Sequence, residues 1–67
     1  MTINKKVKQY LEKKGIKQTT VAKAIRMKPV TLNAILNGRA EMRVDTLVKI
    51  CSFLEIDTGI FFQVDSN

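Results

Sequence analysis

The chain has 67 residues, a net charge of +6, one cysteine and no histidine. A chain of this length forms one small core, so we expect a single domain over residues 1–67. A lone cysteine excludes an internal disulfide, and the usual zinc ligands and catalytic pairs are missing, so we expect no enzyme, metal or cofactor site. No apolar run approaches the roughly 20 residues that span a bilayer, and the N-terminus lacks the apolar core of a secretory signal, so we expect a cytoplasmic protein.

The first elements along the chain are predicted to be two amphipathic helices. Thr2 or Asn4 can cap the start of the first helix, and Gly15 is a stop signal after it. Its apolar face contains Ile3, Val7, Tyr10 and Leu11. The stretch QTTVAKAI predicts a short second helix that ends near Arg26. Its apolar face contains Val21, Ala22 and Ile25.

A third helix is predicted between Pro29 and Asn37-Gly38. Proline is tolerated at the first helical position, and Asn-Gly tolerates the left-handed backbone that ends a helix, so this helix has about eight residues. Its apolar face contains Leu32, Ile35 and Leu36, with Met27 just before it. The side chains of Val30, Asn33, Ala34 and Asn37 point the other way.

The longest apolar repeat predicts a fourth helix, with Asp45 favourably placed in its first turn. The repeat consists of Val44, Leu47, Val48, Cys51 and Leu54. A turn at Ile56-Asp57 leads into a short helical segment, TGIFF, and residues 63–67 are expected to fray. Because no strand-like alternation, repeat or linker occurs, the sequence predicts an all-α fold of four to five helices.

Charge is distributed unevenly along the chain. Residues 1–44 contain eleven Lys and Arg and two acidic residues, a net charge of +9. Residues 45–67 contain one Lys and four acidic residues, a net charge of −3. This division suggests one basic face that meets a polyanion. The alternative is a basic surface that only keeps the protein soluble.

The second and third helices, about residues 18–37, have the pattern of a helix-turn-helix, with the small Ala22 where they cross. The stretches IKQTTVAKAI, VTLNAILNGRAEM and VDTLVKICSFLEIDTGIFF together resemble the lambda-repressor-like, or Cro-like, helix-turn-helix family of bacterial and phage regulators. The resemblance covers nearly the whole chain. It implies a compact four- to five-helix fold that binds duplex DNA sequence-specifically, usually as a dimer on a palindromic operator, and acts as a repressor or autoregulator.

Three positions depart from the family pattern. Arg26 stands in the turn where the family commonly has Gly, and Lys17 and Lys28 stand at helix starts where Ser, Thr or Asn is usual. Lysine offers no acceptor to the first N–H groups and its charge opposes the helix dipole, which costs about 1 kcal/mol relative to a good cap. We hypothesise that DNA phosphates relieve this cost in the complex.

The outward face of the third helix carries the expected base contacts, which are Lys28, Pro29, Val30, Asn33, Ala34 and Asn37. An asparagine can pair with adenine, a lysine can donate to guanine, and Val30 can contact a thymine methyl group. Asn33 is the strongest candidate, whereas Asn37 could instead only cap the helix end. Because Pro29 and Val30 make this face apolar, the operator is expected to be rich in A and T.

The expected phosphate contacts are Lys17, Gln18, Thr31, Arg39 and Arg43. Gln18 matches the family's glutamine at the start of the second helix, although it could be a plain surface residue. Arg43 could instead pair with Glu41 or Asp45. In the first helix, Lys5, Lys6 and Lys8 are expected to add to the general positive field, and Lys13 and Lys14 only to keep the chain soluble. None of these lysines is assigned to the site.

The apolar end of the chain predicts a dimer interface, formed by Ile60, Phe61, Phe62 and Val64. Four small helices cannot easily enclose all four side chains, and a leftover apolar patch commonly marks an interface. The alternative is that Phe61 closes the core and Phe62 packs on the first helix. Cys51 lies on the apolar stripe of the fourth helix and is expected to be an inert core residue.

The main competing interpretation is a protein-interaction module of the same fold, an antitoxin or adaptor, with weak or secondary DNA binding. The missing cap and turn residues favour it, and the net charge of +9 on the segment that includes the third helix opposes it. A peptide lying on a membrane surface would leave the helix-turn-helix pattern unexplained, and exposed aromatics for stacking on RNA are scarce. We predict a DNA-binding regulator whose partners are double-stranded DNA and a second copy, with no membrane or small-molecule ligand.

Overall fold

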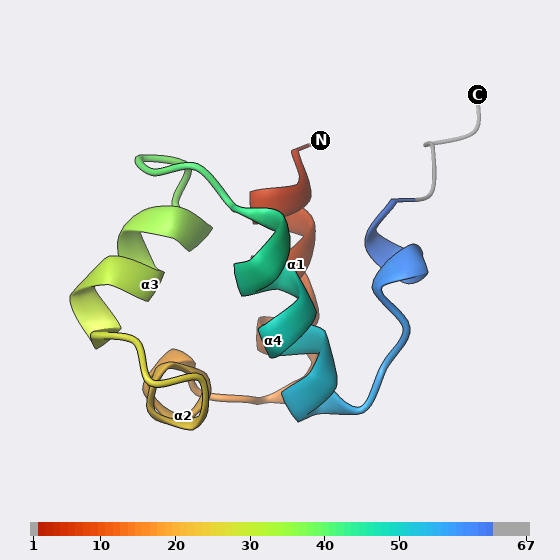
Figure 1. Ribbon diagram of the computed structural model, residues 1–67, viewed down its shortest axis with the longest axis horizontal. Helices are drawn as coiled ribbons and strands as arrows, with labels where there is room; N and C mark the ends of the chain where they lie inside the picture. The colour runs from red at the N-terminus through yellow and green to blue at the C-terminus, as the bar shows by residue number, and fades with distance from the viewer. Residues whose placement is uncertain (1, 63–67) are drawn as a thin grey trace.

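The computed structural model describes residues 2–62, which form four α-helices and one 3₁₀-helix (Figure 1). The expected all-α class is therefore confirmed. In chain order the elements are α1 (Ile3–Lys14), α2 (Gln18–Ala24), α3 (Pro29–Leu36), α4 (Val44–Leu54) and the 3₁₀-helix η1 (Thr58–Phe61).

α3 packs against two other helices, α1 and α2. α2 and α3 contact each other and lie to one side in Figure 1, whereas η1 lies on the opposite side. α1 contacts α3 and η1, and α4 contacts α2 and η1. None of the helices described within residues 2–62 is long and apolar enough to cross a membrane.

Sequence signals at both ends of α1 explain its bounds. Thr2 Oγ1 accepts a hydrogen bond from the backbone N–H of Lys5 at 3.3 Å, so Thr2 rather than Asn4 is the N-cap. Gly15 has φ +70°, the left-handed conformation that glycine adopts without a steric penalty. The N–H of Ile16 then closes the helix end by donating to the carbonyl of Leu11 at 2.8 Å.

The core joins all four α-helices and η1. Ala22 is fully buried, as expected for a small residue at a helix crossing, and Thr46 is a buried polar residue. Burial, with a smaller contribution from the negative charge of Asp57, raises the pKa of the Cys51 thiol, which matches the expected inert cysteine. The other buried residues are Val7, Leu11, Val21, Ile25, Leu32, Ile35, Leu36, Leu47, Ile50 and Phe61.

The expected apolar stripe of α4 is partly wrong. Val44 is 72% exposed and Val48 is 50% exposed, whereas Ile50, absent from the expected stripe, is fully buried. Apolar residues surround much of this helix, so helical spacing alone permits more than one inner face. The face that packs is decided by α2 and η1, which α4 contacts.

The aromatic end of the chain requires one correction. Phe61 is only 5% exposed and packs edge-to-face on Tyr10, with ring centroids 5.7 Å apart, so it closes the core and has little surface to offer a dimer. Ile60 and Phe62 remain 39% and 58% exposed. Val64 and the expected frayed tail lie outside the described residues. The predicted interface is thereby reduced, within residues 2–62, to Ile60 and Phe62.

Candidate nucleic-acid interface

The turn between α2 and α3 uses a left-handed arginine. α2 ends at Ala24, and Arg26 has φ +59°, a region that glycine occupies more readily than a residue with a side chain. The N–H of Met27 donates to the carbonyl of Ala22 at 2.8 Å, which fixes the direction in which the chain enters α3. The position where the family commonly has glycine is thus the position that needs a positive φ.

Three successive helices begin without a side-chain cap. The residues before α2, α3 and α4 have extended backbone, and none accepts a hydrogen bond through its side chain from the helix that follows. These exposed residues are Lys17, Lys28 and Arg43. The first two fit the expected poor caps, and Arg43 was not recognised as a third. Each start therefore combines backbone N–H groups with a cation, and both attract anions.

The outward face of α3 carries a chain of hydrogen-bonded side chains, which we call the α3 polar chain. Asn33 Nδ2 donates to Gln18 Oε1 at 3.1 Å, and Asn37 Nδ2 donates to Asn33 Oδ1 at 3.0 Å. Lys8 Nζ donates to Asn37 Oδ1 at 2.7 Å. These bonds connect side chains of α1 and of the start of α2 to the side chains along α3.

The direction of these bonds determines which ligand atoms the α3 polar chain can bind. Each of its three amide oxygens already accepts one hydrogen bond, while the amide nitrogens and the ammonium group have further N–H groups to donate. The α3 polar chain therefore has more free hydrogen-bond donors than free acceptors. Phosphate oxygens, guanine O6 and N7, adenine N7 and thymine O4 are all suitable acceptors.

The other expected base contacts lie beside this chain. Pro29 is the first residue of α3, and Lys28 immediately precedes it; both are exposed. Val30 is 73% exposed and makes an apolar patch near the start of the helix. Ala34 is only half-buried, and its carbonyl accepts from the N–H groups of Arg39 and Ala40. The structure thus brings the expected base-contact residues to one helix and its ends.

The expected phosphate contacts lie around the edge of α3. Thr31 and Arg39 are exposed, on α3 and in the loop after it. The alternative for Arg43 is confirmed in part, because its Nε lies 3.9 Å from Asp45 Oδ1. Both side chains of that pair are largely exposed, and such a surface pair contributes about 0–1 kcal/mol, so it does not prevent Arg43 from exchanging Asp45 for a phosphate.

Two functional candidates were missed by the sequence analysis. Asn4 Nδ2 donates to the carbonyl of Ile35 at 2.7 Å and to that of Ala40 at 3.1 Å, so it ties α1 to the end of α3 and to the loop that carries Arg39. Lys8, one helical turn after Asn4, completes the α3 polar chain. The available signal was a pair of polar residues at i and i+4 beside the apolar face of the first helix.

Two packed helices joined by a tight turn, the second with an exposed polar face, define a helix-turn-helix domain. A helix-turn-helix family model matches residues 7–61, most of the chain. The chain belongs to the lambda-repressor/Cro-like helix-turn-helix family of DNA-binding regulators, as its motifs had indicated. Comparison of the chain with curated proteins and with solved structures finds no match.

Proposed function

We propose that this protein is a sequence-specific, double-stranded DNA-binding transcriptional regulator, which acts as a small repressor or autoregulator in the cytoplasm. The observation that carries the proposal is the α3 polar chain. An exposed row of hydrogen-bond donors along the second helix of a helix-turn-helix has the chemistry required to contact base edges in the major groove.

Asn33 is proposed as the main base-reading residue. It lies at the centre of the α3 polar chain, bonded to Gln18 on one side and to Asn37 on the other. Its amide oxygen has a second lone pair and its amide nitrogen has a second hydrogen. Asn33 can therefore pair bidentately with adenine while it keeps its hydrogen bonds within the α3 polar chain. Val30, which is 73% exposed, supplies an apolar contact for a thymine methyl group.

Affinity is proposed to come from phosphates at the poorly capped helix starts and from the α3–α4 loop. Lys17 and Lys28 precede N–H groups without a side-chain cap, and Arg39 is exposed in the loop. Each neutralised phosphate releases counterions, so affinity should fall steeply as the salt concentration rises.

A twofold dimer on a palindromic operator is part of the proposal. One copy presents a single short reading helix, and two copies would contact half-sites about one DNA turn apart. The exposed Ile60 and Phe62 are the candidate contact residues within the described part of the chain. Such pairing would double the number of base and phosphate contacts without any change to the domain.

The test is competitive binding to a pool of genomic DNA fragments that includes the protein's own promoter, measured against random duplex across a salt series. A few fragments should be selected. Asn33→Ala should change which fragments are preferred, whereas Arg39→Ala should weaken all fragments alike and reduce the salt slope by about 1. Gln9→Ala, an exposed amide of α1 outside the proposed site, is the matched control and should change neither.

Two results would contradict the proposal. Equal binding to every fragment would mean that the protein contacts phosphates without reading bases. Absence of binding by a folded protein would favour the protein-interaction module of the same fold.

A further inference from the structure

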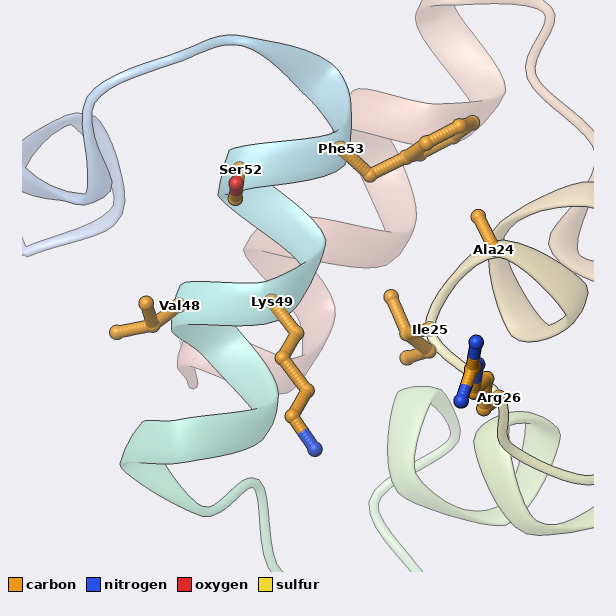
Figure 2. Close-up of a pocket in the computed structure, with 7 residues that line it drawn as sticks. All are labelled: Ala24, Ile25, Arg26, Val48, Lys49, Ser52 and Phe53. Carbon is orange, nitrogen blue, oxygen red and sulfur yellow. The ribbon is translucent and has the colours of Figure 1, made fainter.

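A groove of about 580 Å³ lies between the end of α2 and the exposed side of α4 (Figure 2). Its apolar lining comes from both helices and includes Ala24, Ile25, Val48 and Phe53. Val48 and Phe53 are 50% and 41% exposed, so the groove leaves apolar surface in contact with water.

Two cations stand on facing walls of this groove. Arg26 is in the turn after α2, and Lys49 lies on the side of α4 that faces this turn in Figure 2. No acidic side chain lines the groove within residues 2–62, and neither cation forms an ion pair with a residue of that range. The groove therefore has apolar side chains in its lining and two cations, Arg26 and Lys49, with no acidic side chain of the described residues in that lining.

The backbone conformation of Arg26 is a second observation that points to a functional role for this residue. Its φ of +59° is a conformation that glycine would adopt at lower cost, so the chain holds a cationic side chain beside the groove against a local conformational preference. Residues held in such conformations cluster at functional sites.

We propose that the groove binds an acidic, amphipathic segment of a partner protein. An apolar side chain of the partner would pack against the exposed Ala24 and Phe53, and flanking carboxylates would pair with Arg26 and Lys49. Nucleic acid fits this groove poorly, because a phosphate backbone does not cover apolar side chains. A second copy, which has the same net charge of +6, is a poorer match for a cationic groove than an acidic partner.

This partner site is separate from the surface proposed for DNA. No residue that lines the groove belongs to the α3 polar chain or to the expected base and phosphate contacts. The groove and the proposed DNA surface therefore share no residue, and the inference does not depend on the proposed function.

The experiment is an NMR titration of the full chain with a short synthetic peptide in which a Leu-Phe pair is flanked on both sides by Glu and Asp. The backbone amide signals of Ile25, Lys49 and Phe53 should shift most. One control peptide replaces Leu-Phe by Ser-Ser and another replaces the acids by Lys, and both should bind more weakly. Lys49→Glu should raise the Kd by about tenfold, because it exchanges an attraction for a repulsion.

A matched variant separates the groove from net charge. Lys13→Glu makes the same charge change at an exposed position of α1 that does not line the groove, and it should leave the Kd within about twofold. Phe53→Ser removes an exposed apolar contact and should also weaken binding, with folding checked by circular dichroism.

Several outcomes would overturn the inference. Shifts confined to Gln18, Asn33 and Asn37 would mean that the peptide only imitates phosphate on the basic face. Equal losses in Lys49→Glu and Lys13→Glu would mean that net charge decides binding. Concentration-dependent shifts at the groove without peptide would assign it to a second copy.

Discussion

α1 and the α2–α3 unit contribute to the same core, but their ends are built from different residues. α1 starts with a threonine that accepts a backbone hydrogen bond and stops at a left-handed glycine. α2 and α3 start with lysines that cap nothing, and the turn between them places an arginine in the left-handed region. The first helix follows the local rules that stabilise an isolated helix; the helix-turn-helix departs from them at three positions.

The three residues that depart from these rules lie at the proposed binding sites. Lys17 and Lys28 belong to the surface proposed for DNA, and Arg26 lines the groove proposed for a partner. A residue that serves only folding usually has the backbone conformation that its type prefers. Residues that also serve binding depart from that preference more often. Lys17 and Lys28 are poor caps in the free protein and suitable neighbours for phosphates. Mutations in the two regions should therefore affect stability and binding differently.

The largest expected effect comes from the core that both regions share. Leu32 of α3 is fully buried, so Leu32→Ala should lower the free energy of unfolding by about 2–5 kcal/mol through lost burial and a cavity. Val30→Ala on the outer face of the same helix should change it by about 0.5 kcal/mol or less. Chemical denaturation measures both, and similar losses in the two variants would contradict the assigned inner face of α3.

The next effect concerns the link from α1 to the α3–α4 loop. Asn4→Ala leaves the carbonyls of Ile35 and Ala40 without their side-chain donor and should cost about 1–2 kcal/mol in denaturation. Gln9→Ala on the same helix is the control and should be nearly neutral. If Asn4 only supports the fold, DNA affinity measured well below the melting temperature will stay unchanged; if it positions the loop, affinity will fall.

A pair of reciprocal changes at left-handed positions should have effects of opposite sign. Gly15→Ala should lower the free energy of unfolding by about 1 kcal/mol, because alanine is strained at φ +70° even though the space is open. Arg26→Gly should raise it by up to about 1 kcal/mol by removing strain at φ +59°. Thermal unfolding of both variants tests this, and a loss of stability in Arg26→Gly would mean that its side chain also supports the fold.

The smallest expected effects come from the helix starts. Thr2→Ala removes a cap from α1 and should cost about 0.5–1 kcal/mol, whereas Lys17→Ser adds a cap to α2 and should stabilise by a similar amount. Lys17→Ser should also weaken DNA binding, because it removes a positive charge beside a proposed phosphate. Lower stability of Lys17→Ser together with unchanged binding would refute the proposed role of the helix starts.

Helix bounds were the most predictable feature, because single residues set them. Pro29 marks the first residue of α3, and Gly38, with φ +81°, follows its end. The inner face of α4 was less predictable, since Val48 and Ile50 are equally apolar and only tertiary contacts bury one of them. The position of Phe61 against Tyr10 also depends on contacts distant in sequence.

The expected base-contact face could be inferred from helical periodicity, but its hydrogen bonding could not. Asn33, Asn37 and Gln18 were named individually, and their connection requires the actual distance between α2 and α3. Lys8 and Asn4 reach across from α1, and their i, i+4 spacing indicates only a shared helix face, not the groups of α3 to which they donate. Long-range polar contacts of this kind are set by the packed fold rather than by any one helix.

The most direct measurement is the change in backbone amide chemical shifts when the protein binds a duplex selected from the genomic pool. We predict the largest changes along the α3 polar chain, at Gln18, Asn33 and Asn37, with small changes at Val48 and Phe53 in the groove. Large changes at Val48 and Phe53 with an unperturbed α3 would contradict the assignment of α3 as the DNA-reading helix.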